Sequence, residues 1–159
     1  DPRLRGGLVV TFEMRAMTKD DLPAVADIYR FHVQRDPPRQ WMDAASRSMD
    51  DPGGPPLAWV AEDAAGRVIG YVAGEVRSWE FGSEPAGWIT GVGVDADHRS
   101  SGLGRALLEA MLKAFRRRNV ATVRTMVQRD DVPVLRFFRA AGFATGPYTE
   151  MELSLEGEP

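Results

Sequence analysis

The sequence contains no cysteine. This excludes disulfide bonds, cysteine-ligated zinc, iron–sulfur centres and every thiol nucleophile. Histidine is also scarce, because only His32 and His98 occur and neither belongs to an H-E-x-x-H pattern. We therefore expect no metal site.

Lysine is almost absent, since only Lys19 and Lys113 contribute to the 20 basic residues and the rest are arginine. Neither lysine stands in a Walker A motif, so the chain is not a P-loop nucleotide hydrolase. The formal net charge of −3 also argues against a nucleic-acid partner, which would require an excess of Lys and Arg on one face.

Long hydrophobic runs are missing as well. No run approaches the roughly 20 apolar residues that a membrane-spanning helix needs. The apolar stretch at residues 8–10 is too short for a signal peptide. We therefore expect a cytoplasmic protein with no membrane partner.

The composition is typical of one globular domain, with 159 residues, 43% of them hydrophobic and 27% charged. A chain of this length buries roughly 70% of the surface that it exposes when unfolded, which is enough for a stable core. We expect residues 1–7 to be a disordered or engineered end and residues 8–159 to form the domain.

Hydrophobic periodicity predicts an α/β architecture. Alternation with a period of two predicts strands, and apolar residues at helical spacing predict helices. The strongest helical pattern begins at Leu103 and ends in Arg116–Arg118, a basic run that we interpret as a solvated helix end. The expected strands cover residues 8–15, 57–62, 68–76, 88–94, 120–127 and 148–155, and the expected helices cover 19–35, 41–49, 103–118 and 132–141.

The order of these elements predicts a mixed sheet. The strands at 57–62 and 68–76 should form an antiparallel hairpin, whereas the later strands alternate with helices, so helices should cover both faces of the sheet. Gly91 and Gly93 in the fourth strand predict a bulge or a close backbone approach.

A glycine-rich segment, Arg99-Ser100-Ser101-Gly102-Leu103-Gly104-Arg105, lies between the fourth strand and the long helix. Such a turn exposes backbone N–H groups that have no partner within the helix, and the helix dipole adds partial positive charge there. The segment therefore favours a phosphate ligand. The alternative is a tight strand-to-helix turn with the two serines as caps.

A second glycine motif, at residues 91–96, formally matches the G-x-G-x-x-A dinucleotide fingerprint. That fingerprint needs a helix that opens at its own glycines, but residues 95–101 are polar and non-periodic. We therefore reject a dinucleotide-dependent oxidoreductase.

The glycine-rich segment resembles the GNAT superfamily of acyl-CoA-dependent N-acetyltransferases. Arg99-x-x-Gly102-x-Gly104 matches its pyrophosphate motif R/Q-x-x-G-x-G/A, and residues 94–96 resemble the strand-end V-x-P that precedes it. Residues 131–143 resemble a second motif of the family, N-x-x-A-x-x-L-Y-x-x-x-G-F. With the opening segment 15–23, the resemblance extends over most of the chain.

The resemblance implies a single-domain α/β fold with a mixed sheet splayed between the fourth and fifth strands. The pantetheine arm of acetyl-CoA, the acyl-donor cosubstrate, would lie in that gap. A bulge there would leave a backbone donor able to polarise the thioester carbonyl. The residues implied to bind acetyl-CoA are Val92, Gly93, Val94, Arg99, Ser100, Ser101, Gly102, Leu103, Gly104, Arg105, Asp131 and Phe138.

The chain departs from the family at positions that carry catalysis. Phe138 stands where the family usually has a tyrosine that protonates the leaving thiolate, and Asp131 stands where it has asparagine. Met126 stands where some members have a glutamate base, and we interpret it as a core residue. These departures put the usual acid and base in doubt.

Other residues are therefore candidates for the catalytic roles. We expect Glu75, on the third strand, to be the general base, with Glu62, Glu84 and His98 as alternatives. Tyr148 is the candidate for the missing phenol, although a packing role for it is the alternative.

The function implied is transfer of an acetyl group to a primary amine, on a small molecule or a peptide, by direct attack in a ternary complex. A non-catalytic acyl-CoA sensor and a purely structural domain are the alternatives, and a homodimer is left open. We expect the acceptor near the first helix, residues 35–41, the Pro/Gly-rich loop at 50–56 and residues 78–85. Candidate lining aromatics are Trp41, Trp79, Phe81 and Trp88.

Overall fold

The computed structural model describes residues 11–157, in two compact units that divide between Met126 and Val127. The end predicted at residues 1–7 and the first part of the predicted first strand lie outside the described residues. Within the described residues, no helix is both long and apolar enough to cross a bilayer.

The first unit is built on a five-stranded sheet with the order β1-β2-β3-β4-β5. The strands pair antiparallel from β1 to β4, and β5 joins β4 in parallel. This confirms the predicted mixed sheet and its hairpin. The strands are β1 Phe12–Ala16, β2 Ala58–Asp63, β3 Val68–Arg77, β4 Ala86–Val94 and β5 Val123–Arg124.

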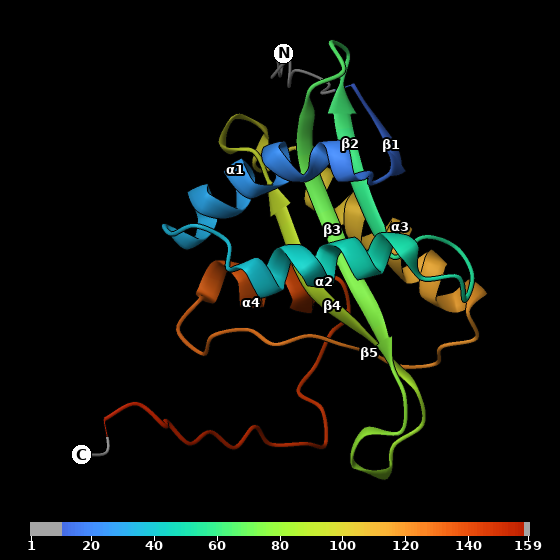
Figure 1. Ribbon diagram of the computed structural model, residues 1–159, viewed down its shortest axis with the longest axis vertical. Coiled ribbons are helices and arrows are strands. Elements are labelled where there is room, and N and C mark those ends of the chain that lie inside the picture. The colour runs from blue at the N-terminus through green and yellow to red at the C-terminus, as the bar shows by residue number, and fades with distance from the viewer. Residues whose placement is uncertain (1–10, 158–159) are drawn as a thin grey trace, which may run out of the picture. The chain divides into compact units, whose positions relative to one another are not determined.

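Helices cover both faces of this sheet, as predicted. The helices α1 (Leu22–Val33) and α2 (Arg39–Asp50) cross one face, and α3 (Leu103–Arg117) packs on the other (Figure 1). We call these the α1/α2 face and the α3 face. The core on the α1/α2 face gathers around Val25, Ile28 and Tyr71, all at most 6% exposed.

The α3 helix lies close to the sheet because β3 and β4 present glycines to it. A Cβ added at Gly87 would lie 2.8 Å from ring atoms of Phe115, and one at Gly74 would lie 3.0 Å from the same ring. Phe115 itself is fully buried. The aromatic ring therefore occupies the space that side chains at these two positions would fill.

A β-bulge interrupts β4 beside Gly91, near the position predicted. Ala73 pairs with Gly91 but Gly74 pairs with Ile89, so Thr90 is the extra residue. Bulges of this kind bend a strand and increase its twist. The bend follows directly after the last pair of the β4–β5 ladder, which joins Trp88 to Arg124. The two strands therefore separate beyond this point, and the sheet is splayed as the resemblance implied.

An ion-pair cluster connects the start of α1 to the sheet. Thr18 and Asp21 form a capping box, and both Asp21 oxygens accept hydrogen bonds from Arg15 at 2.7 and 2.8 Å. Arg15 also donates to Glu62 on β2 at 2.6 Å. The guanidinium holds the pKa of Asp21 below its ordinary value, so the carboxylate stays ionised and the pair stabilises the fold at neutral pH.

Two predictions about side chains in this unit are wrong, and so is the predicted length of one strand. Arg118 is not solvated: its side chain is 5% exposed, lies 3.0 Å from Asp51 and donates to the Pro55 carbonyl at 2.6 Å. Met126 is 65% exposed rather than part of the core, and Met14 is also exposed. The fifth strand is shorter than predicted because only Val123 and Arg124 pair with β4.

The second unit contains the helix α4 (Val132–Ala140). Asp131 caps it by accepting a hydrogen bond from the Val134 N–H at 3.2 Å. The strand predicted at 148–155 is absent from the described ladders. Apolar side chains alternate there, but they are exposed, up to 88% at Met151, and periodicity without a partner strand does not make a sheet.

Candidate active site

The segment between β4 and α3 forms a compact turn. Asp95 accepts a hydrogen bond from the Asp97 N–H at 2.8 Å and so opens a short 3₁₀ turn, Ala96–His98. The Ser101 hydroxyl donates to the His98 carbonyl at 2.5 Å and lies 3.4 Å from the Leu103 N–H. These bonds shape the turn so that the helix begins at Leu103, as the sequence predicted.

Gly102 makes this entry into α3 feasible. Its φ is +83°, a left-handed conformation that L side chains rarely adopt, and a Cβ there would meet nothing within 4 Å. The first N–H groups of an α-helix have no acceptor within the helix, and here the positive end of a 15-residue helix dipole lies behind them. The arrangement has the features of an anion site.

The outer edge of β4 offers backbone groups beside this turn. The Asp95 N–H donates to the Ile69 carbonyl of β3, so the Val94 carbonyl points the other way. By alternation along the strand, the N–H groups of Val92 and Val94 and the Val92 carbonyl also face away from β3. They lie beyond the end of the β4–β5 ladder. An extended ligand with amide groups can therefore hydrogen-bond along this edge.

The exposed Arg99 side chain has defined contacts beside the turn. Its Nη2 lies 2.7 Å from Nδ1 of His32, near the end of α1, and its central carbon lies 5.1 Å from the centre of the Phe31 ring. The other ring nitrogen of His32 lies 2.8 Å from the Val94 carbonyl oxygen. Sequence reasoning missed His32 because nothing local relates it to residues more than 60 positions away.

Tyr71 is a second residue that sequence reasoning missed. Its ring packs over β4 between Gly91 and Gly93, where added Cβ atoms would lie 3.2 Å and 2.7 Å from it. The close approach predicted from these glycines is thus the approach of a tyrosine. Burial raises the pKa of the Tyr71 hydroxyl, so it remains a neutral hydrogen-bond donor.

Glu75, the predicted base, lies on the α1/α2 face by alternation from Tyr71, and it pairs with Trp88 across the β3–β4 ladder. Its carboxylate accepts a hydrogen bond from Arg77 at 2.6 Å and is 35% exposed. The Arg77 guanidinium lies 4.5 Å from the centre of the Trp88 ring. The carboxylate is thus solvent-accessible and close in the ladder to the bulge.

The comparison with known families agrees with this geometry. A family model described as the acetyltransferase (GNAT) family matches residues 22–143. The chain belongs to the GNAT acetyltransferase family. The enzymes of this family are acetyltransferases that use acetyl-CoA.

Curated relatives of this GNAT chain carry the name mycothiol acetyltransferase. The one from Saccharomonospora viridis is 38% identical over 90 residues, which are 55% of this chain and 29% of that protein. The one from Thermobispora bispora is 30% identical over 103 residues, 64% of this chain and 35% of the relative. The chain thus spans about a third of the length of these relatives.

Solved structures confirm the GNAT fold. The aminoglycoside N-acetyltransferase AAC(6')-Iy in complex with CoA superposes with a TM-score of 0.74 at 15% identity, covering 96% of this chain and 99% of that one. Ard1 from Thermoplasma volcanium gives a TM-score of 0.72 at 24% identity, covering 85% and 84%. At these identities the likeness establishes the fold alone.

The alternative bases, Glu62, Glu84 and His98, differ in their hydrogen bonds and solvent exposure. Glu62 accepts hydrogen bonds from Arg15 on the β1–β2 side, two strands away from β4, and is structural. Glu84 is exposed in the β3–β4 connection. His98 is mostly enclosed in the turn, where its Nδ1 has no hydrogen-bond partner among the described residues and lies 3.6 Å from Asp95. Of the four carboxylates and imidazoles considered, Glu75 combines accessibility with proximity to the bulge.

Three predicted site residues, two of them in the second GNAT motif, lie in the second unit. Asp131 is occupied as the α4 cap. Phe138 is 5% exposed, with the rings of Phe137 and Phe143 each centred 5.1 Å away. Tyr148 is 50% exposed and does not begin a strand.

The aromatics predicted to line an acceptor pocket divide into two groups. Trp41 is a packing residue, with its ring centre 4.8 Å from that of Tyr29 and 5.8 Å from that of Tyr71. Trp79 and Phe81 are 62% and 87% exposed in the connection between β3 and β4. The Pro/Gly-rich loop accepts a hydrogen bond from Arg118, which follows the last residue of α3. The loop therefore lies at the C-terminal end of α3, whereas the glycine turn lies at the N-terminal end of that helix. We therefore remove Trp41 and this loop from the candidate acceptor site.

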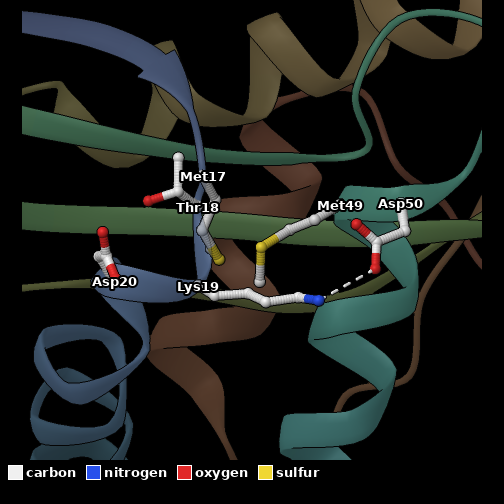
Figure 2. A pocket seen from close by; sticks show the side chains of 6 residues that line it. All are labelled: Met17, Thr18, Lys19, Asp20, Met49 and Asp50. Carbon is white, nitrogen blue, oxygen red and sulfur yellow. Dashed lines mark ion pairs between the residues drawn. The ribbon is translucent and has the colours of Figure 1, made fainter.

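A shallow cavity of about 420 Å³ lies elsewhere, between the end of β1 and the end of α2 (Figure 2). Met17 and Met49 form its floor, and the Lys19 ammonium lies 3.5 Å from Asp50 across it. It contains none of the predicted acetyl-CoA or catalytic residues, so it is not the candidate active site.

Proposed function

We propose that the chain transfers the acetyl group of acetyl-CoA to a primary amine by direct attack in a ternary complex. The observation that carries this proposal is the open edge of β4 leading into a glycine turn at the start of α3. The edge suits the amide groups of a pantetheine arm, and the turn suits a pyrophosphate. The β4 edge at Val92–Val94 would bind the pantetheine arm of acetyl-CoA, and the turn at Arg99–Arg105 would bind its pyrophosphate.

In the proposed reaction the amine nitrogen attacks the thioester carbonyl carbon. A C–N bond forms, the C–S bond breaks, and CoA leaves as a thiolate. An ordinary thiol has a pKa of about 8.5, so this leaving group is tolerable near neutral pH even without an acid. Glu75 would accept the amine proton, directly or through water, and Tyr148 would protonate the sulfur.

We further propose that both compact units belong to one acetyltransferase domain. The supporting observation is that the family match at residues 22–143 continues across the division after Met126.

Amine-dependent release of CoA tests the proposed function. Because the chain has no cysteine, a thiol-reactive dye would report released CoA without background from the protein. A panel of simple amines, polyamines, aminoglycosides, amino acids, peptides and a mycothiol-type acceptor should contain at least one that releases CoA. Mass spectrometry would identify the acetylated product, and it replaces the dye for acceptors that carry a thiol. Acetyl-CoA binding without release by any acceptor would favour the sensor.

Glu75→Gln should lower turnover at least about 100-fold and leave acetyl-CoA affinity unchanged, because general-base assistance is typically worth about 10²- to 10⁴-fold. The pH–rate profile should lose its acidic limb. Glu13→Gln, an exposed carboxylate on β1, is the matched control and should turn over normally. Normal turnover of Glu75→Gln, with a loss in Glu84→Gln instead, would transfer the role to Glu84.

A further inference from the structure

His32 contacts two parts of the candidate donor site that are far from it in sequence. Its Nε2 lies 2.8 Å from the carbonyl oxygen of Val94 at the end of β4. Its Nδ1 lies 2.7 Å from Nη2 of Arg99 in the glycine turn. The ring also packs on β4, since its Cδ2 would lie 3.4 Å from a Cβ at Gly93. One imidazole thus connects α1, the edge of β4 and the turn.

These two contacts determine the protonation state of the ring. A carbonyl oxygen can only accept, so Nε2 must carry a hydrogen and donate it to Val94. A guanidinium can only donate, so Nδ1 must present its lone pair to Arg99. Both bonds coexist only when the ring is neutral with its hydrogen on Nε2. A proton added at Nδ1 removes the acceptor and places two cations in contact.

The described contacts of this exposed ring are with a cation, backbone groups and an aromatic ring, and none of them is with a carboxylate. The turn contributes Arg99, and β4 contributes the backbone of Gly93 and Val94. The next carboxylate, Asp95, already accepts a hydrogen bond from the Asp97 N–H and lies near Arg67 and His98. On α1 itself the neighbour is the Phe31 ring, while Arg30 is paired with Asp27 and Asp36.

We propose that neutral His32 is a positioning residue that holds Arg99 in place for the pyrophosphate of acetyl-CoA, and that its protonation releases Arg99. The inference rests on the proposed donor site. One guanidinium nitrogen is committed to His32, which leaves the remaining N–H groups for a phosphate oxygen. Because protonation of Nδ1 removes the acceptor for Arg99, acetyl-CoA should bind less tightly at acidic pH than at pH 8.

Calorimetric titration of acetyl-CoA without an acceptor tests this, using the wild type, His32→Gln and His32→Phe. Glutamine offers an acceptor oxygen and a donor nitrogen but does not titrate, so it can replace both bonds. Between about pH 8 and pH 5.5 the wild-type Kd should rise about threefold to tenfold more than that of His32→Gln. Dividing the change in Kd of the wild type by that of His32→Gln cancels the effect of titrating the phosphate groups of acetyl-CoA, which is the same for both proteins.

His32→Phe should bind weakly at both pH values. S-acetylpantetheine, which has no pyrophosphate, should bind the wild type and His32→Gln alike at both pH values, because both retain a donor to the Val94 carbonyl. The inference is overturned if His32→Gln follows the wild-type pH dependence, if His32→Phe binds acetyl-CoA as tightly as the wild type at pH 8, or if S-acetylpantetheine loses the same factor. Binding with this pH dependence but no amine product would refute the proposed transfer while leaving the role of His32 intact. A protein that does not bind acetyl-CoA at all would refute both.

Discussion

Gly104→Asp should weaken acetyl-CoA binding by at least about 100-fold, the largest effect on binding that we expect from a single substitution. Gly104 lies in the first turn of α3, where the free N–H groups and the dipole favour an anion. A carboxylate placed there would repel a pyrophosphate, and like charges in a site with few waters cost several kcal/mol. Calorimetry on the folded variant measures the loss.

The helix itself should tolerate this change, because an acidic side chain in the first turn is favourable for the helix dipole. Gly104→Ala is the matched control: it adds a Cβ without charge, and the family motif accepts alanine at this position, so its Kd should stay within about tenfold of the wild type. A folded Gly104→Asp protein that binds acetyl-CoA as well as the wild type would show that the turn is not the pyrophosphate site.

Phe115→Ala should lower the free energy of unfolding by about 3–5 kcal/mol. The fully buried ring fills the space above Gly74 and Gly87. These two glycines have no side chains that could fill this space once the ring is removed. Removing it leaves a cavity between α3 and the sheet. Denaturant unfolding measures the change, and Phe115→Leu, which retains most of the volume, should lose less than about 1.5 kcal/mol.

A second substitution checks that the loss comes from this contact. Gly87→Ala should destabilise the wild type, because its Cβ would lie 2.8 Å from the ring. In the Phe115→Ala background the same change should cost less or become stabilising, since the methyl group enters the cavity. Additive effects of the two substitutions would contradict the packing described.

The parts of the fold that sequence predicted well are those specified locally. The antiparallel hairpin of β2 and β3 and the start of α3 at Leu103 depend on neighbouring residues, and both are confirmed. Residues 148–155 have the alternation of a strand, but pairing depends on a partner that the pattern does not reveal. Nor can a run of three arginines show which one turns inward to Asp51.

The candidate site divides in the same way. The anion-binding turn is recognisable because its glycines and arginines are contiguous. The contributions of Tyr71 and His32 depend on the register of β3 against β4 and on the contact of α1 with β4, so they emerge only in three dimensions. Phe138 and Asp131 match a motif by position, yet their described contacts are those of core packing and helix capping.

The bulge at Thr90 has a consequence for the thermodynamics of ligand binding. The extra residue is part of the covalent chain, and the β4–β5 ladder ends just before it. No backbone pairing of β4 with β5 therefore has to be broken along residues 90–94. If the proposed pantetheine arm binds this edge, its amide hydrogen bonds would contribute to affinity without a free-energy cost for separating the sheet.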